Sequence, residues 1–109
     1  MKEDIKKILK FRDDRDWKKF HSAKNLAISL SLEASEILEL FQWSCDNTLP
    51  KDKYEHLKEE VADVYYYLLL LAHETKIDIK EAFENKMKQN RNKYPVDKAK
   101  GKSKKYTEL

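Results

Sequence analysis

The sequence is poor in the residues that break regular structure or cross-link it: it has one cysteine, one glycine and two prolines among 109 residues. A single cysteine, Cys45, excludes an internal disulfide and favours a reducing compartment. One glycine cannot build a glycine-rich phosphate loop of the Walker type. Few turn formers together with abundant Lys, Glu and Leu predict a chain that is mostly helical.

Long hydrophobic segments are also missing from the sequence. The longest apolar run, Val64 to Ala72, has nine residues, which is too short to span a bilayer. The first residues carry too many charges for a secretory signal. We therefore expect a soluble cytoplasmic protein with no membrane partner.

Charge is abundant but uneven. Charged residues make up 39% of the chain and the formal net charge is +3. The last fourteen residues hold five lysines against Asp97 and Glu108, so the surplus lies in this tail. We expect one helical domain over residues 1–95 and a flexible basic tail over residues 96–109. A neutral body with a basic tail is weak evidence for nucleic-acid binding, and we do not expect that partner.

The apolar spacing predicts four helices, over residues 3–12, 23–43, 53–73 and 79–93. Ser22 is the expected N-cap of the second helix, and Tyr94-Pro95 should end the fourth. A loop is expected over residues 45–52. Because the third helix is apolar on every side from Val64 to Ala72, we predict an all-α four-helix bundle assembled as a homo-oligomer.

The third helix has two candidate faces. The predicted core stripe consists of Leu57, Val61, Val64, Leu68 and Leu71. The stripe beside it consists of His56, Glu60, Asp63, Tyr67 and Leu70. The acidic residues should therefore flank the core seam, where a facing helix could reach them.

Two pairs of acidic residues carry the chemistry. Glu33 and Glu36 are three residues apart on the second helix, and Glu60 and Asp63 are three apart on the third. Residues at this spacing are neighbours on a helix, with Cβ atoms roughly 5–6 Å apart. Four carboxylates from two facing helices would form an all-oxygen site suited to Mg²⁺, with Mn²⁺ as a possible substitute. The simpler alternative is an ordinary solvated helix surface.

Aromatic residues suggest a second feature of the site. Trp17 and Trp43 flank the second helix, and Tyr67 lies one turn beyond Asp63. Such side chains either pack in the core or stack on a nucleobase, a contact worth roughly 1–3 kcal/mol per base. His21 is either a structural hydrogen-bonding residue or a ligand contact.

With these residues in view, the chain resembles the MazG-like all-α nucleotide pyrophosphohydrolases, especially their small dCTP-pyrophosphatase-like branch. The family pattern is ExxE followed by ExxD, here Glu33-Ala-Ser-Glu36 and, after 23 residues, Glu60-Val-Ala-Asp63. The blocks RDWKKFHSAKNLA, ELFQW, EEVADVYYYLLLLA and NKMKQNRNKYP also resemble that branch. The similarity extends over nearly all of residues 11–95.

The resemblance implies Mg²⁺-dependent hydrolysis of a (deoxy)nucleoside triphosphate to the monophosphate and pyrophosphate, as housecleaning of the nucleotide pool. A dCTP-like nucleotide is the leading substrate candidate. Glu33, Glu36, Glu60 and Asp63 would hold the metal, and Glu36, with Glu33 beside it, would orient or deprotonate the water. The base and sugar pocket would be shaped by Trp17, His21, Trp43 and Tyr67. Lys86, Asn90 and Tyr94 would contact phosphate or ribose. A homodimer or a dimer of dimers is also implied.

The alternative is a non-catalytic helical interaction module. The acidic residues would then be solubilising surface, and the basic tail would contact nucleic acid. This reading predicts salt-dependent nucleic-acid binding and no effect of neutralising Glu36 or Asp63.

Overall fold

A computed structural model describes residues 1–44 and 48–109. The described residues form helices and contain no strand, so the predicted all-α class is confirmed. The elements are α1 (Lys2–Asp14), η1 (Lys18–Phe20), α2 (Ala23–Leu40), η2 (Lys51–Lys53), α3 (Tyr54–Glu74), α4 (Ile79–Lys93), α5 (Val96–Ala99) and η3 (Tyr106–Glu108). Cys45, which the predicted loop includes, lies outside the described residues.

The chain divides into two compact units, Met1–Ile77 and Asp78–Leu109. The boundary predicted at residue 95 falls inside the second unit, between α4 and α5. In that unit the ring of Tyr106 lies edge-on to Tyr94, 6.1 Å between centroids, and the Lys93 ammonium lies 4.8 Å from the Tyr106 ring. The tail thus contacts the end of α4, while its flexibility stays a prediction.

Two side chains start helices by satisfying free backbone N–H groups. Ser22 accepts a hydrogen bond from the backbone N of Asn25 at 3.1 Å, which confirms it as the N-cap of α2. Asp78 caps α4 in the same way through the backbone N of Glu81 at 3.1 Å. The α2 helix ends at Leu40, before the predicted residue 43. Trp43 has a φ of 71°, a left-handed conformation that cannot continue a helix.

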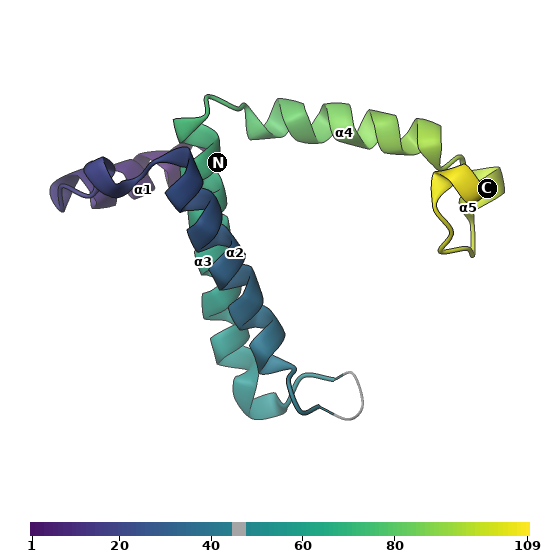
Figure 1. Cartoon of the computed structure of the whole chain (residues 1–109), viewed down its shortest axis with the longest axis horizontal. Helices are drawn as coiled ribbons and strands as arrows, with labels where there is room; N and C mark the ends of the chain where they lie inside the picture. The colour runs from purple at the N-terminus through teal and green to yellow at the C-terminus, as the bar shows by residue number, and fades with distance from the viewer. Residues whose placement is uncertain (45–47) are drawn as a thin grey trace. The chain divides into compact units, whose positions relative to one another are not determined.

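In the first unit, α2 and α3 run antiparallel and side by side, and α1 packs on α3 (Figure 1). The buried apolar side chains are Leu26 on α2 and Leu69, Leu70 and Ala72 on α3. These residues lie near the end where α2 begins and α3 ends. They form the small core that holds the helix pair together.

The predicted core stripe of α3 is wrong in part for the single chain: Leu57, Val64 and Leu71 are half-buried, but Val61 and Leu68 are exposed. Val61 is 52% exposed and Leu68 is 40% exposed, whereas Leu70, from the neighbouring stripe, is 1% exposed. The reason is that α2 packs on the side of α3 that carries Glu60 and Leu70. Glu33 and Glu60 are therefore half-buried in the helix contact, whereas Glu36 and Asp63 remain exposed.

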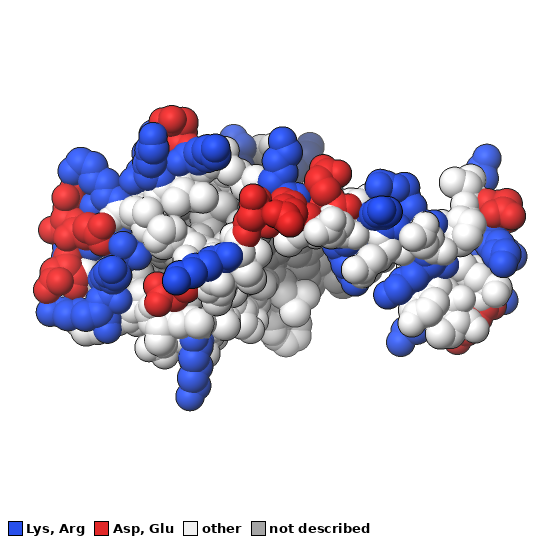
Figure 2. Space-filling model, turned by 90° about the horizontal axis from the view of Figure 1, so that it is seen from above, with Lys and Arg blue, Asp and Glu red and all other residues white. Residues whose placement is uncertain are grey.

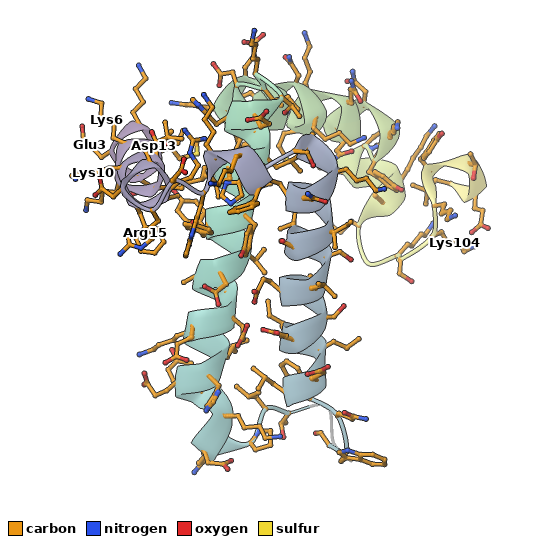
Figure 3. All side chains as sticks on the ribbon, turned by 60° about the vertical axis from the view of Figure 1, so that its left-hand side comes forward. Glu3, Lys6, Lys10, Asp13, Arg15 and Lys104 are labelled. Atoms are coloured by element: carbon orange, nitrogen blue, oxygen red, sulfur yellow. The ribbon has the colours of Figure 1, made fainter. Side chains whose placement is uncertain are left out.

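Charged side chains occupy the outer surface of the helices. On the face drawn in Figure 2, Lys and Arg are interspersed with Asp and Glu. Figure 3 shows Glu3, Lys6 and Lys10 of α1 pointing away from α3. The opposite face of α1 is left for contact with the helix pair. Among the described residues, no helix combines the length and the apolar character needed to cross a bilayer.

Replacing Leu70 tests this arrangement. Leu70→Ala should lower the free energy of unfolding by about 2–5 kcal/mol, because it leaves a cavity in the core. Leu70→Met, which conserves volume, should cost less than about 1.5 kcal/mol. Urea denaturation of both variants measures the difference. An equal, small loss in both would contradict burial of Leu70.

Candidate metal centre and aromatic pocket

Three carboxyl groups meet where α2 faces α3. Glu33 and Glu36 come from successive turns of α2, and Glu60 comes from α3. One oxygen atom from each lies within 4.8 Å of the others. The structure thus brings together three of the four acidic residues predicted from their spacing. We call Glu33, Glu36 and Glu60 the carboxylate cluster.

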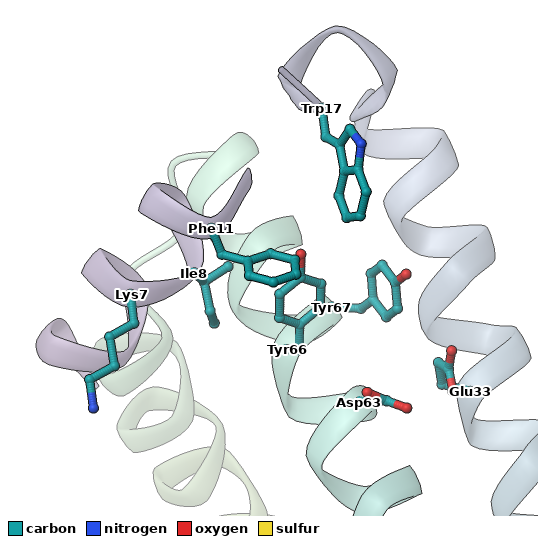
Figure 4. A pocket seen from close by; sticks show the side chains of 8 residues that line it. All are labelled: Lys7, Ile8, Phe11, Trp17, Glu33, Asp63, Tyr66 and Tyr67. Carbon is teal, nitrogen blue, oxygen red and sulfur yellow. The ribbon is translucent and has the colours of Figure 1, made fainter. Parts of the chain in front are cut away.

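Asp63, the fourth predicted acidic residue, lies beside this cluster. It lines the same pocket as Glu33, and Figure 4 shows the two carboxyl groups facing each other from α3 and α2. Its negative charge acts on both Glu33 and Glu60. Asp63 is therefore placed to serve as a further oxygen ligand at the edge of the cluster.

Crowding of the carboxyl groups shifts their protonation. Burial, followed by the neighbouring Glu36 and Glu60 carboxyl groups, raises the pKa of Glu33 to about 7. The adjacent Glu36 carboxyl, followed by burial, raises the pKa of Glu60. Both raised pKa values mean that it is unfavourable to ionise all carboxyl groups of the cluster when no cation compensates their charge.

Two carboxyl oxygens of the cluster have no hydrogen-bond partner, which indicates the kind of ligand that the cluster could bind. Oε2 of Glu33 and Oε2 of Glu60 are both buried and have no hydrogen-bond partner. A buried acceptor without a partner costs about 1–3 kcal/mol, and more when it is charged. A divalent cation would supply the missing partner to both oxygens and neutralise the crowded charge. The residues present therefore fit a divalent metal site.

A pocket of about 590 Å³ opens next to the cluster. Its lining residues are Lys7, Ile8, Phe11, Trp17, Glu33, Asp63, Tyr66 and Tyr67 (Figure 4). This volume lies within the roughly 300–1,000 Å³ usual for small-molecule sites, which are mostly apolar with a few convergent polar groups. Glu33 belongs both to the pocket and to the carboxylate cluster.

The aromatic rings of the pocket contact one another edge to face. Ring centroids are 5.7 Å apart for Phe11 and Trp17, 6.2 Å for Phe11 and Tyr66, and 5.0 Å for Tyr66 and Tyr67. These are favourable aromatic distances. Because Phe11 lies on α1, Trp17 precedes η1 and the tyrosines lie on α3, three segments are joined into one aromatic wall.

Two residues of this aromatic wall were predicted from the sequence. Trp17 and Tyr67 were predicted to line a base pocket, and both do line the pocket beside Glu33. Phe11 and Tyr66 were not singled out, and the structure adds them. The available signal was that Phe11 lies three residues after Ile8 on an amphipathic first helix, so both share one face.

The other residues predicted to contact the substrate come from both units of the chain. His21 follows η1 and is half-buried, with an unpartnered Nδ1, and burial followed by the charge of Arg12 lowers its pKa. Trp43 is 89% exposed beyond the end of α2. Lys86, Asn90 and Tyr94 lie on α4 or at its C-cap, in the second unit. Their roles in substrate binding stay predictions.

The chain is similar to known proteins along most of its length. The model of the MazG-like family matches residues 28–109. The chain is 40% identical over 114 residues to dCTP pyrophosphatase 1 of Homo sapiens and 39% identical over 113 residues to that of Mus musculus. Each alignment covers 98% of this chain and 66% of the relative, so the chain spans slightly less than two thirds of their length.

A solved structure is similar along most of its length. It is the crystal structure of a pyrophosphatase from Archaeoglobus fulgidus, with a TM-score of 0.74 and 41% sequence identity. The match covers 87% of this chain and 92% of that one. Both the fold and the sequence are therefore shared with this archaeal protein.

The raised pKa values predict how the metal-free protein responds to pH. A carboxyl group whose pKa is higher in the folded state binds its proton more tightly there. Stability from Glu33 is therefore full below pH 4.5 and is lost as pH rises through about 7. In EDTA, the melting temperature should fall between pH 5 and pH 8, and Glu33→Gln should reduce that fall. A melting temperature that rises over this range and is unaffected by Glu33→Gln would contradict the crowding.

Proposed function

Since this chain belongs to the MazG-like family, we propose that it is a Mg²⁺-dependent nucleoside triphosphate pyrophosphohydrolase. The observation that carries the proposal is the carboxylate cluster opening into an aromatic pocket, with Glu33 in both. Metal-binding oxygens would then meet the phosphates while rings hold the base. We place this activity in the cytoplasm, in the removal of unwanted nucleotides from the pool.

The metal is proposed to be Mg²⁺, with Mn²⁺ able to replace it. Carboxylates alone form the cluster, and hard oxygen ligands of this kind suit Mg²⁺ and Mn²⁺. When bound, the cation would supply charge neutralisation to the phosphate oxygens and acidify a water molecule. Glu33, Glu36, Glu60 and Asp63 would hold it.

The chain's own residues would then perform the following tasks. Glu36 is the exposed member of the cluster, so its carboxylate can reach a water molecule, orient it and accept its proton. Glu33 belongs to both the cluster and the pocket, so it would hold the metal next to the bound substrate. The water oxygen would bond to one of the two phosphorus atoms of the α–β phosphoanhydride while the bridging P–O bond breaks. The bridging oxygen would leave on the other phosphate, and the water proton would pass to the Glu36 carboxylate. The products are nucleoside monophosphate and pyrophosphate.

The pocket supports a nucleotide as substrate. Trp17, Tyr66 and Tyr67 offer ring faces or edges to a base, and stacking contributes roughly 1–3 kcal/mol per base. The relatives are named dCTP pyrophosphatase 1, which makes a deoxycytidine triphosphate our leading candidate. His21 and Trp43 would complete the base and sugar contacts, with phosphate or ribose contacts from Lys86, Asn90 and Tyr94.

Activity is tested by product analysis. Incubation with dCTP and Mg²⁺ should yield dCMP and pyrophosphate, resolved by ion-exchange chromatography, and EDTA should abolish the reaction. Glu36→Gln should lower kcat at least about 100-fold, because general-base catalysis contributes 10²–10⁴-fold.

Glu39→Gln is the matched control. Glu39 lies one turn beyond Glu36 on the same exposed face of α2 but is not part of the cluster, so its activity should stay within about twofold of the parent. Equal losses in both variants would argue against the proposed site. Orthophosphate and dCDP as products would exclude the proposed reaction. Indifference to metal and to Glu36→Gln would favour the non-catalytic interaction module.

We also propose that the chain works as a homo-oligomer, a dimer or a dimer of dimers. Within the described residues, large apolar side chains remain exposed on the helix pair, including Leu32 at 60%, Leu38 at 72% and Val61 at 52%. Val61 and Leu68 share one face of α3 seven residues apart, the spacing of a helix contact stripe. A second copy would bury these side chains.

Light scattering after size exclusion tests the assembly. The mass should be at least twice the 13.1 kDa of one chain. Val61→Lys should lower that mass, because a charge in an apolar contact is costly, whereas Lys58→Ala on an exposed turn should not. A monomeric parent protein would exclude the homo-oligomer.

A further inference from the structure

The first helix contributes to the pocket and packs on α3. Lys7, Ile8 and Phe11 on α1 make up one side of the pocket lining. Figure 4 shows Ile8 and Phe11 directed toward the tyrosines of α3. The shape of the pocket therefore depends on the position and angle of α1 on α3.

Two contacts between α1 and α3 define that angle. Near the start of α1, the Tyr65 hydroxyl donates a hydrogen bond to Oδ2 of Asp4 at 2.7 Å. Two turns later, Phe11 lies edge-on to Tyr66, with 6.2 Å between centroids. Asp4 and Phe11 are seven residues apart, or about 10 Å along the helix axis. Because the two contacts lie on different turns of α1, together they restrain the direction of this helix on α3.

Other contacts of Phe11 do not fix α1 on α3. The Arg15 guanidinium lies 3.7 Å from the Phe11 ring centre, and Arg15 Nη1 donates to the Phe11 carbonyl at 3.0 Å. Trp17 also packs against this ring. All of these partners lie within residues 11–17, so they order the end of α1 locally. Near the beginning of α1, the Asp4–Tyr65 hydrogen bond connects this helix to α3.

We propose that Tyr65 and Asp4 are positioning residues, whose hydrogen bond sets α1 as the wall of the substrate pocket. This inference rests on the proposed function and adds to it two residues that do not line the pocket. The bond is short and its acceptor is a carboxylate, so it belongs to the stronger, charge-assisted class. Loss of this hydrogen bond should make α1 more mobile as the wall of the pocket and leave the geometry of the carboxylate cluster unchanged.

Kinetics of Tyr65→Phe provide the first measurement. This substitution removes only the hydroxyl group. KM for dCTP should rise about three- to tenfold, in line with the loss of one such hydrogen bond. The kcat value should stay within about twofold, because the carboxylate cluster is unchanged.

Tyr54→Phe is the matched control. Tyr54 lies on the same helix and is also exposed, but its ring contacts Lys58 within α3 and not α1. The control should leave KM unchanged. In a double-mutant cycle, Asp4→Ala and Tyr65→Phe should be non-additive, because either one breaks the same bond.

Hydrogen exchange provides a readout that does not depend on activity. Amide exchange in residues 2–14 should accelerate at least about threefold in Tyr65→Phe, while residues 54–74 stay as protected as in the parent. Unchanged exchange, an unchanged KM despite faster exchange, or a fall in kcat at constant KM would each overturn the positioning role. If the parent hydrolyses no triphosphate at all, the proposed function fails, and the KM-based role of the bond fails with it. The exchange data would still show whether the bond holds α1.

Discussion

Repulsion between carboxyl groups is the constraint around which the helix pair is built. Glu33, Glu36 and Glu60 lie within 4.8 Å of one another at the contact between α2 and α3. This arrangement opposes association of the two helices unless protons or a cation compensate the charge. The buried leucines supply the opposing attraction, and they lie toward the other end of the contact. The buried leucines thus stabilise one part of the helix pair, and the carboxylate cluster lies in another part.

The pocket joins the carboxylate cluster to the aromatic wall. Glu33 is half-buried and belongs to both the cluster and the pocket, so a bound molecule must meet the acidic residues and the aromatic wall together. The wall itself is assembled from α1, from Trp17 before η1 and from α3. The proposed substrate, a triphosphate with an attached base, would contact the carboxyl groups and the rings at the same time. The chain belongs to the MazG-like family.

The errors in the sequence-based predictions have physical causes. Val61 and Leu68 were assigned to the core because their spacing is regular and apolar, yet both are exposed in the single chain. Periodicity identifies an apolar stripe but does not say whether its partner is a helix of the same chain or of another copy. The end of α2 was placed too late, since no glycine marks the left-handed residue at Trp43.

The sequence by itself determined the all-α class, the Ser22 cap, the bounds of α4 and the pairing of acidic residues, because each depends on local spacing and capping. The MazG-like resemblance also followed from the order of short motifs, and the family match confirmed it. Only the tertiary structure decided that Glu60 meets Glu33 and Glu36, that Phe11 contacts Tyr66, and that Asp4 reaches Tyr65. These contacts join residues far apart in the chain, and their existence depends on how whole helices pack.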